Sequence, residues 1–112
     1  LRFPVFSRNQ NDYDLLVYVA NWPAQRRHHW RQLLIARAME NLACVVGVNR
    51  IGADAKGFQY SGDSLAIAAD GELLLDAQND NAAASVVLDG AALKHYREKF
   101  PCQLDADSFQ LD

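Results

Sequence analysis

The sequence predicts an α/β layered fold built around one βαβ unit, and three observations carry that prediction. An apolar run, a long helical pattern and a second apolar run follow one another between Tyr13 and Asn49. Further on, Asp70-Gly71 separates two apolar runs, which is typical of a tight hairpin turn. The chain has 112 residues, of which 50% are hydrophobic and 22% are charged. That composition suits one small globular domain over residues 1–112.

The first half contains the βαβ unit. Tyr13–Ala20 is apolar almost throughout, the pattern of a strand covered on both faces. Asn21-Trp22-Pro23 ends this strand, because Asn is a good helix cap and Pro is tolerated in a first turn. Apolar residues recur at helical spacing from about Ala24 to Leu42, and Ala43–Asn49 is a second buried strand. Since such crossovers are almost always right-handed, the two strands are predicted to be parallel.

The second half is predicted to be antiparallel. Ser64–Ala68 and Glu72–Leu75 read as two strands joined at the Asp-Gly turn, and Gly52–Gly57 before them reads as a loop. Another strand is expected at Ala84–Leu88, where the apolar run is rich in valine.

The C-terminal part is predicted to hold one short helix. This helix spans about Ala91–Lys99 and ends before Pro101, because proline cannot continue a helix. Residues Cys102–Asp112 are then expected to form an extended acidic tail.

Charge and cysteine usage exclude several classes of function. A net charge of −3 and a pI near 5.5 provide no basic surface for nucleic acid or for an anionic membrane. The longest apolar run is too short to span a bilayer. Cys44 and Cys102 lack the spacing of a zinc or redox motif, and their usage favours a reducing, cytoplasmic setting. Cys44, in the middle of a strand, is interpreted as a buried, unreactive thiol.

The predicted elements need more cover than the chain provides. A parallel sheet requires helices on both faces, and only one long helix is visible. We therefore expect the chain to be about half of a layered fold. The other half is expected to be N-terminal, because the sequence opens without an initiator Met.

Several runs of residues resemble the carbon–nitrogen hydrolase (nitrilase) superfamily in order and spacing, and they cover essentially the whole chain. In that superfamily, a run similar to the opening one directly follows the catalytic cysteine of a Cys-Tyr-Asp stretch. The similarity is greatest to the omega-amidase branch. The matching runs are Leu1-Arg2-Phe3-Pro4, Tyr13–Ala20 with Asn21-Trp22-Pro23, Ala36–Asn41, Val45–Arg50, Tyr60–Ser64 and Asp70-Gly71-Glu72.

The resemblance implies both a fold and an activity. The fold is the C-terminal half of a nitrilase-like four-layer αββα sandwich with mixed sheets. The activity is hydrolysis of the omega-amide of a small dicarboxylic acid monoamide, such as 2-oxoglutaramate, through a cysteine thioester. The Cys, Glu and Lys of that mechanism are expected upstream of Leu1, so no catalytic residue falls in this sequence and the isolated chain is expected to be inactive. The resemblance implies no cofactor or metal and, by analogy, a homodimer formed partly through the helix Ala24–Leu42.

Three residues are candidates for binding the substrate. Arg2 lies a few residues past the expected nucleophile, where its guanidinium is suited to a substrate carboxylate; a salt bridge to a buried acid is the alternative. Asn21 and Trp22 follow the end of a parallel strand, where α/β sheets place their ligands. Trp22 is then a wall of the pocket and Asn21 a hydrogen-bonding group, the alternatives being a core aromatic and a helix cap. Arg26 is a weaker candidate.

Other polar residues have structural interpretations. Adjacent His28 and His29 point to different faces of a helix, which argues against a metal site. Glu40 lies three residues after Arg37 and suits an ion pair on the helix. Two functions therefore stay open: part of an omega-amidase-like hydrolase, or a non-catalytic binding or assembly module that retains the fold.

Overall fold

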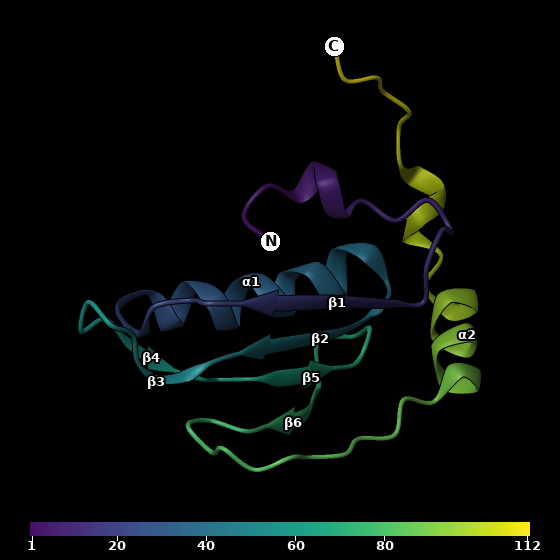
Figure 1. The fold of residues 1–112 in the computed structure, drawn as a ribbon. Coiled ribbons are helices and arrows are strands. Elements are labelled where there is room, and N and C mark those ends of the chain that lie inside the picture. The colour runs from purple at the N-terminus through teal and green to yellow at the C-terminus, as the bar shows by residue number, and fades with distance from the viewer.

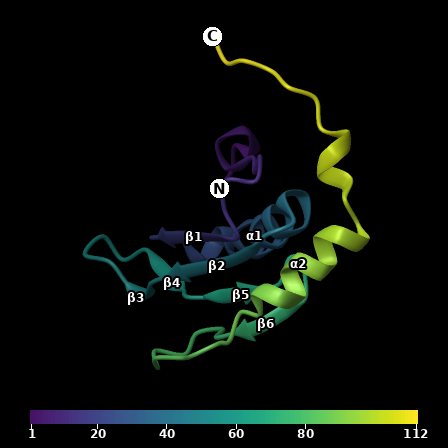
Figure 2. The same cartoon turned by 90° about the vertical axis from the view of Figure 1, so that its right-hand side faces the viewer.

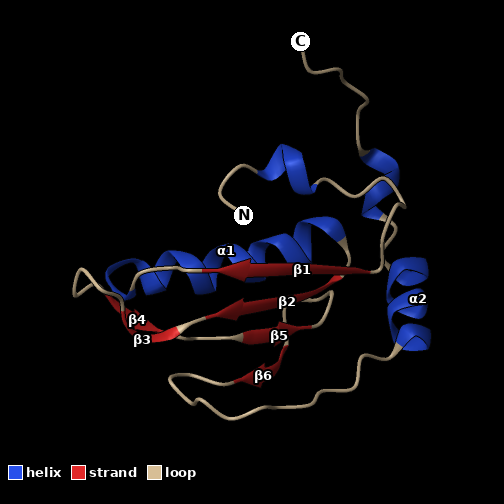
Figure 3. Cartoon of the chain, in the orientation of Figure 1, coloured by secondary structure: helices blue, strands red, loops and turns tan.

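The computed structural model describes all 112 residues, which form a four-stranded sheet, a separate hairpin and two α-helices (Figures 1 and 3). No helix is long and apolar enough to cross a membrane. The α-helices are α1 (Arg27–Asn41) and α2 (Gly90–Lys99), and short 3₁₀ turns cover Pro4–Ser7, Ala24–Arg26 and Cys102–Asp105. The strands are β1 (Leu15–Ala20), β2 (Cys44–Asn49), β3 (Ile51–Ala53), β4 (Gln59–Ser61), β5 (Leu65–Ile67) and β6 (Leu73–Asp76).

The predicted βαβ unit is confirmed. β1 and β2 are parallel, and their register runs from Leu15 opposite Cys44 to Ala20 opposite Asn49. The connection begins with a 3₁₀ turn and becomes α-helical at Arg27. The helix stops at Leu42, whose left-handed conformation (φ 46°) turns the chain into β2. Strand and helix therefore lie within two or three residues of their predicted bounds.

The core lies between α1 and one face of the sheet. Trp30, Leu34 and Ala38 of α1 are fully buried. They pack against Val45 of β2 and against Leu65 and Ile67, the first and last residues of β5. Burial of each large side chain contributes about 1.5–3 kcal/mol. β2 approaches the helix so closely that a Cβ on Gly47 would sit 2.4 Å from Leu34 Cδ1. A glycine is therefore required where strand and helix touch.

The other face of the sheet carries no helix (Figure 1). β1 alternates between exposed and half-buried residues, so the prediction that it is covered on both faces is wrong for this chain. Val17 is 54% exposed and Val19 82% exposed, and Val48 of β2 is open beside them. β1 is apolar on both of its faces, but the chain supplies only one of the two layers that would cover them. We refer to Leu15, Val17, Val19 and Val48 as the open face.

The predicted hairpin is confirmed, with a shorter first strand and a second strand displaced by one residue. β5 pairs antiparallel with both β2 and β6, which gives the strand order β1-β2-β5-β6. At the turn the N–H of Gly71 donates to the carbonyl of Ala68 (2.9 Å). Gly71 takes φ +92°, a conformation that side-chain-bearing residues rarely adopt.

Two other predictions need correction. Gly52–Gly57 is not simply a loop, because Ile51–Ala53 and Gln59–Ser61 pair as the hairpin β3–β4 and only its tip is a turn. Ala84–Leu88 forms no strand: residues 77–89 run from β6 to α2 without a strand partner, and Val87 is 88% exposed. The apolar composition of that run therefore does not reflect pairing.

Helix α2 begins at Gly90 and lies across the end of the sheet where β1 starts (Figure 2). The Asp89 carboxylate caps it by accepting hydrogen bonds from the N–H groups of Ala91 and Ala92. Arg97 fastens it to the domain, because its guanidinium donates to the carbonyl of Leu42 (2.7 Å) and to that of Tyr13 (3.1 Å). The helix matches the prediction, and after a 3₁₀ turn at Cys102–Asp105 the rest of the tail has no regular structure.

Candidate active site at the carboxyl ends of the parallel strands

β1 and β2 end side by side, with Ala20 opposite Asn49. Beyond that point the two strands diverge: β1 continues into Asn21-Trp22-Pro23, and β2 leaves the sheet to form the hairpin β3–β4. The carboxyl ends of parallel strands, where the chain separates in this way, are the usual ligand position of α/β sheets. This end of the sheet is therefore the candidate site.

Trp22 is the central side chain of this site. Its indole Nε1–H donates to the carbonyl of Arg26 (2.7 Å), and its ring centroid lies 5.6 Å from that of Trp30, tilted by 40°. Trp22 is only half-buried, so part of the ring packs on the core while the rest remains accessible. The two interpretations of this residue, core aromatic and pocket wall, are therefore compatible.

Arg2 lies against this indole. Its guanidinium carbon is 5.3 Å from the centroid of the Trp22 ring, a cation–π distance worth about 0.5–1 kcal/mol at an exposed site. Arg2 is exposed and has no acidic partner, so the alternative of a salt bridge to a buried acid is wrong for this chain. The preceding residue is anchored, because the Leu1 carbonyl accepts hydrogen bonds from Arg37 Nε (2.9 Å) and Nη2 (2.6 Å). Within this chain, the Arg2 guanidinium thus has the Trp22 ring and no acidic group as its partner.

Asn21 does not act as a helix cap. The caps of the 3₁₀ turn and of α1 are Pro23 and Arg26, and neither makes a side-chain capping bond. Asn21 is exposed, next to Trp22 at the end of β1. Its predicted hydrogen bond to a substrate stays a prediction, as does the weaker candidacy of the exposed Arg26.

The sequence analysis missed Asn49, which is only 8% exposed. Its side-chain Oδ1 accepts from the N–H of Trp22 (2.7 Å), and its Nδ2 donates to the carbonyls of Trp22 (3.0 Å) and Gly62 (2.8 Å). The Ser64 hydroxyl holds the main chain of Asn49 from the β5 side, at 3.1 Å from its nitrogen. The available signal was a lone amide at the last position of an otherwise apolar strand.

Asp63 was also missed, and it is fully buried. Its carboxylate accepts from Arg27 Nη2 (2.6 Å), Arg31 Nη1 (3.1 Å) and the Ser61 hydroxyl (2.6 Å). Its carbonyl accepts from Trp30 Nε1–H (2.7 Å). Asp63 has φ +55°, a left-handed conformation that Asp tolerates better than most residues. It thus ties the first turn of α1 to the segment between β4 and β5, directly behind the tryptophan pair.

The charges around Asp63 outweigh its burial. Burial is the largest single influence and raises the pKa of Asp63, but hydrogen bonds from Arg27 and Ser61 and the charges of Arg27 and Arg31 together bring it below its usual value. Arg31 also pairs through both nitrogens with Asp76 of β6 (2.6 and 2.8 Å). Its hydrogen bond is the main reason that the pKa of Asp76 is lowered. The carboxylates are thus held ionised as structural anchors.

The remaining candidates have structural roles. Cys44 is buried, and burial raises the pKa of its thiol, which confirms its interpretation as a buried thiol and disfavours the nucleophilic thiolate. The predicted Arg37–Glu40 ion pair is present at 2.8 Å. His28 and His29 are exposed, and the structure contains no group of His, Cys, Asp and Glu side chains that could hold a metal.

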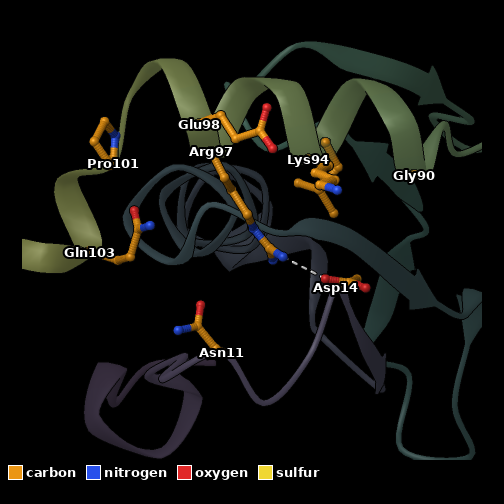
Figure 4. A pocket seen from close by; sticks show the side chains of 9 residues that line it. Asn11, Asp14, Gly90, Lys94, Arg97, Glu98, Pro101 and Gln103 are labelled. Atoms are coloured by element: carbon orange, nitrogen blue, oxygen red, sulfur yellow. Dashed lines mark hydrogen bonds and ion pairs between the residues drawn. The ribbon is translucent and has the colours of Figure 1, made fainter.

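Two of the surface pockets lie at opposite ends of the sheet. One lies beside Trp22, between the turn containing Pro23 and Arg26 and the tip of the hairpin β3–β4, where Asp54 and Lys56 line it. The other lies at the opposite end of the sheet, between α2 and the loop that leads into β1 (Figure 4). There Arg97 is paired with Asp14 at 2.5 Å, which ties helix to loop. Only the first pocket borders the carboxyl ends of the parallel strands.

As a chemical arrangement, the site can bind and orient but cannot itself provide a nucleophile. Arg2 offers a cation, Trp22 an apolar wall, and the neighbouring main chain is rigidly held by Asn49. Such a wall suits a small ligand with a carboxylate and an apolar body.

Residues 1–97 match the carbon–nitrogen hydrolase family, and the chain belongs to that family. Among its relatives, omega-amidase YafV of Escherichia coli is 55% identical over 112 residues, and YafV of Yersinia enterocolitica is 52% identical. These alignments cover 99% of this chain and 44% of each relative. A 2-oxoglutaramate amidase of Bacillus subtilis is 31% identical over 103 residues, covering 90% of this chain and 39% of the relative. The chain thus spans less than half the length of these relatives.

Solved structures show the same fold. A carbon–nitrogen hydrolase superfamily protein from Xanthomonas campestris, with an arsenic adduct in its active site, superimposes with a TM-score of 0.96 at 41% identity. That match covers 99% of this chain and 45% of the other. A carbon–nitrogen hydrolase from Helicobacter pylori gives a TM-score of 0.82 at 18% identity over 93% of this chain and 42% of the other. The predicted family and α/β fold class are therefore confirmed.

Proposed function

We propose that the protein carrying this chain is an omega-amidase that hydrolyses the terminal amide of a small dicarboxylic acid monoamide such as 2-oxoglutaramate. The observation that carries the proposal is the 55% identity to an omega-amidase over the whole chain. The 2-oxoglutaramate amidase of Bacillus subtilis, at lower identity, supports the same class of substrate.

The proposed reaction proceeds through a thioester. A cysteine thiolate upstream of Leu1 attacks the amide carbonyl, and the tetrahedral intermediate expels ammonia after the leaving nitrogen accepts a proton from a glutamic acid. A lysine and main-chain N–H groups stabilise the negative charge on the oxygen. Water, deprotonated by the same glutamate, then hydrolyses the thioester to the acid and regenerates the thiol.

The residues of this chain supply the binding wall in the proposed mechanism. Arg2 pairs with the distal carboxylate of the substrate, Trp22 covers its methylene groups, and Asn21 donates a hydrogen bond. The exposed guanidinium beside the Trp22 indole supports this assignment, because an arginine without an acidic partner is available for a substrate anion.

The test is ammonia release from 2-oxoglutaramate by the intact protein, with an uncharged amide such as butyramide for comparison. We expect hydrolysis of both, with a much higher kcat/KM for 2-oxoglutaramate. Absence of hydrolysis by a folded protein that carries the upstream cysteine would instead favour a non-catalytic module.

Arg2 is tested in the same assay. Arg2→Ala is expected to raise KM for 2-oxoglutaramate by roughly 10- to 100-fold, the equivalent of about 1.5–3 kcal/mol for a charged hydrogen bond, and to leave butyramide hydrolysis little changed. Lys94→Ala, which removes an exposed cation of α2 at the opposite end of the sheet, is the control. Unchanged kinetics with a lower melting temperature would assign Arg2 to stability alone.

The assembly and location of the protein are also proposals. We propose a cytoplasmic homodimer in which the exposed side of α1 contributes to the interface, and no activity for the 112-residue chain alone. Analogy with the family supports the dimer, and the outward-facing His28, His29 and Met39 supply surface for it. Light scattering on the intact protein, cell fractionation and an assay of the isolated chain test these three points.

A further inference from the structure

We propose that Asn49 is a positioning residue that fixes Trp22, and through Trp22 the Arg2 guanidinium, in the orientation that selects carboxylate-bearing amides. This inference rests on the proposed function and adds to it a determinant of substrate selectivity. Asn49 itself does not touch the substrate in this account.

The need for such a residue follows from the way the sheet ends. The parallel register stops at Ala20 opposite Asn49, and β2 then leaves the sheet to form the hairpin β3–β4. The main chain of Trp22, two residues past the end of β1, consequently has no strand beside it. A main-chain segment without partners would leave the wall of the site loosely defined.

The Asn49 side chain takes the place of the missing strand. A primary amide carries one carbonyl and one N–H₂ group in a plane, as a peptide group carries one acceptor and one donor. Its Oδ1 accepts from the Trp22 N–H (2.7 Å), and its Nδ2 donates to the Trp22 carbonyl (3.0 Å). Both main-chain polar groups of Trp22 are thus hydrogen-bonded, as they would be if a neighbouring strand continued beside this residue.

Three further contacts make this clamp rigid. The second N–H of the Asn49 amide donates to the Gly62 carbonyl (2.8 Å), so all of its strong donors are used. The Ser64 hydroxyl fixes the main chain of Asn49 on both its nitrogen (3.1 Å) and its oxygen (3.3 Å). Asn49 is also nearly excluded from solvent, which makes each of these bonds costly to lose.

The clamp is connected to the proposed binding group through one side chain. Trp22 is held by Asn49 at its main chain and by the Arg26 carbonyl at its indole, and it carries Arg2 at 5.3 Å. A shift of the Trp22 main chain therefore moves the surface on which the guanidinium rests. A misplacement of about 1 Å is sufficient to cost a large factor in a positioned reaction.

The experiment compares Asn49→Asp and Asn49→Ala in the intact protein, with 2-oxoglutaramate and butyramide as substrates. The aspartate keeps the size of the side chain but, when ionised, turns the two donors into acceptors that face carbonyl oxygens. Alanine removes the clamp without adding charge. Asn41→Ala is the matched control, since it removes an equally buried asparagine amide that bonds Asn9 and Arg37 at the other end of α1 and makes no bond to Trp22.

We expect both Asn49 variants to raise KM for 2-oxoglutaramate by about 10-fold, while the kinetics with butyramide change by less than about 2-fold. Asn41→Ala should keep the ratio between the two substrates, even where it lowers the melting temperature. Adding Arg2→Ala to Asn49→Ala should lower the preference for 2-oxoglutaramate little further than Arg2→Ala alone, because both changes act on the same contact.

Other results would overturn the inference. Equal losses with both substrates, fully additive effects with Arg2→Ala, or failure of both Asn49 variants to fold would each assign Asn49 to stability alone. The unmodified intact protein distinguishes this outcome from a failure of the proposed function. If the unmodified protein hydrolyses 2-oxoglutaramate with the expected preference, the proposed function stands whatever the variants do. If the unmodified protein has no amidase activity, both the proposed function and the proposed role of Asn49 are wrong.

Discussion

The two faces of the central sheet differ sharply although both are lined by apolar residues. Toward α1, Trp30, Leu34 and Val45 are buried and packed closely enough to require Gly47. On the open face, Val17 and Val19 of β1 meet no helix.

This difference shows what the apolar pattern of a strand predicts. It indicates how many faces of the strand have to be covered by another layer, but not whether that layer comes from the same chain. An alternating strand would indicate one solvated face, whereas β1 is apolar at every position from Leu15 to Ala20. The open face accordingly fits the prediction, still to be tested, that this chain is one half of a four-layer sandwich.

The largest expected effect is that of Trp30→Ala on the covered face. The substitution empties the centre of the core and removes the hydrogen bond to the Asp63 carbonyl. We expect a loss of about 3–5 kcal/mol in the free energy of unfolding of the intact protein, measured by chemical denaturation. Trp22→Ala, which removes the half-buried partner of the same pair, should cost less, and an equal loss would contradict the unequal burial of the two rings.

Gly47→Ala tests how closely α1 approaches β2. The new methyl group would lie 2.4 Å from Leu34 Cδ1 and 2.9 Å from the Trp30 ring, so these side chains, or the helix that carries them, must shift. A destabilisation of about 1–3 kcal/mol is expected from this overpacking, seen as a lower denaturation midpoint. Gly90→Ala is the control because a Cβ there meets nothing within 4 Å. A neutral Gly47→Ala would mean that the two layers are looser than described.

Asp63→Asn weakens the ion pairs that attach the first turn of α1 to the segment between β4 and β5. The amide loses the charge that holds Arg27 and Arg31, and because Arg27 is 54% exposed we expect a modest cost of about 1–2 kcal/mol. The native pKa of Asp63 lies below the unfolded value, so its stabilisation is present above about pH 4 and is lost as pH falls through the native pKa. Denaturation midpoints measured between pH 7 and pH 3 should therefore fall less steeply in Asp63→Asn. Identical slopes would exclude a linked proton at this site.

The smallest effect is expected on the open face. In the isolated 112-residue chain, Val17→Thr with Val19→Thr should leave the secondary-structure content, read from far-UV circular dichroism, unchanged, because neither side chain is packed. The isolated chain is expected to bind a hydrophobic dye and to unfold without a sharp transition, and the double variant should bind less dye. A sharp cooperative melt of the unmodified chain would contradict the half-domain prediction.

Local patterns predicted most of the fold. The βαβ unit was readable because two apolar runs flank a helical period, and the hairpin because Asp70-Gly71 has a distinctive turn chemistry. The run Ala84–Leu88 was wrongly predicted to be a strand because its composition shows that it suits a strand but not whether the chain places it beside another strand.

The candidate site was only partly predictable, for a related reason. Trp22 and Arg2 were identified through their place beside recognisable motifs, and the structure brings them together. Asn49 contacts Trp22, which lies 27 positions earlier in the chain, and Asp63 contacts Arg27, which lies 36 positions earlier. Periodicity describes only neighbours in sequence, so a buried polar residue that bridges distant segments has no local signature beyond its unexpected polarity.

The hydrogen bonds of Arg97 fix the position of α2, so that this position does not depend on the length of the segment that leads to the helix. Residues 77–89 have no strand partner, whereas α2 is fixed by bonds from Arg97 to Leu42 and Tyr13, far earlier in the sequence. The closure entropy of a flexible connection rises only by about 0.6 kcal/mol for each doubling of its length. Insertions or deletions within residues 83–88, which make no hydrogen bond to the rest of the chain, should therefore be tolerated while α2 stays in the same place.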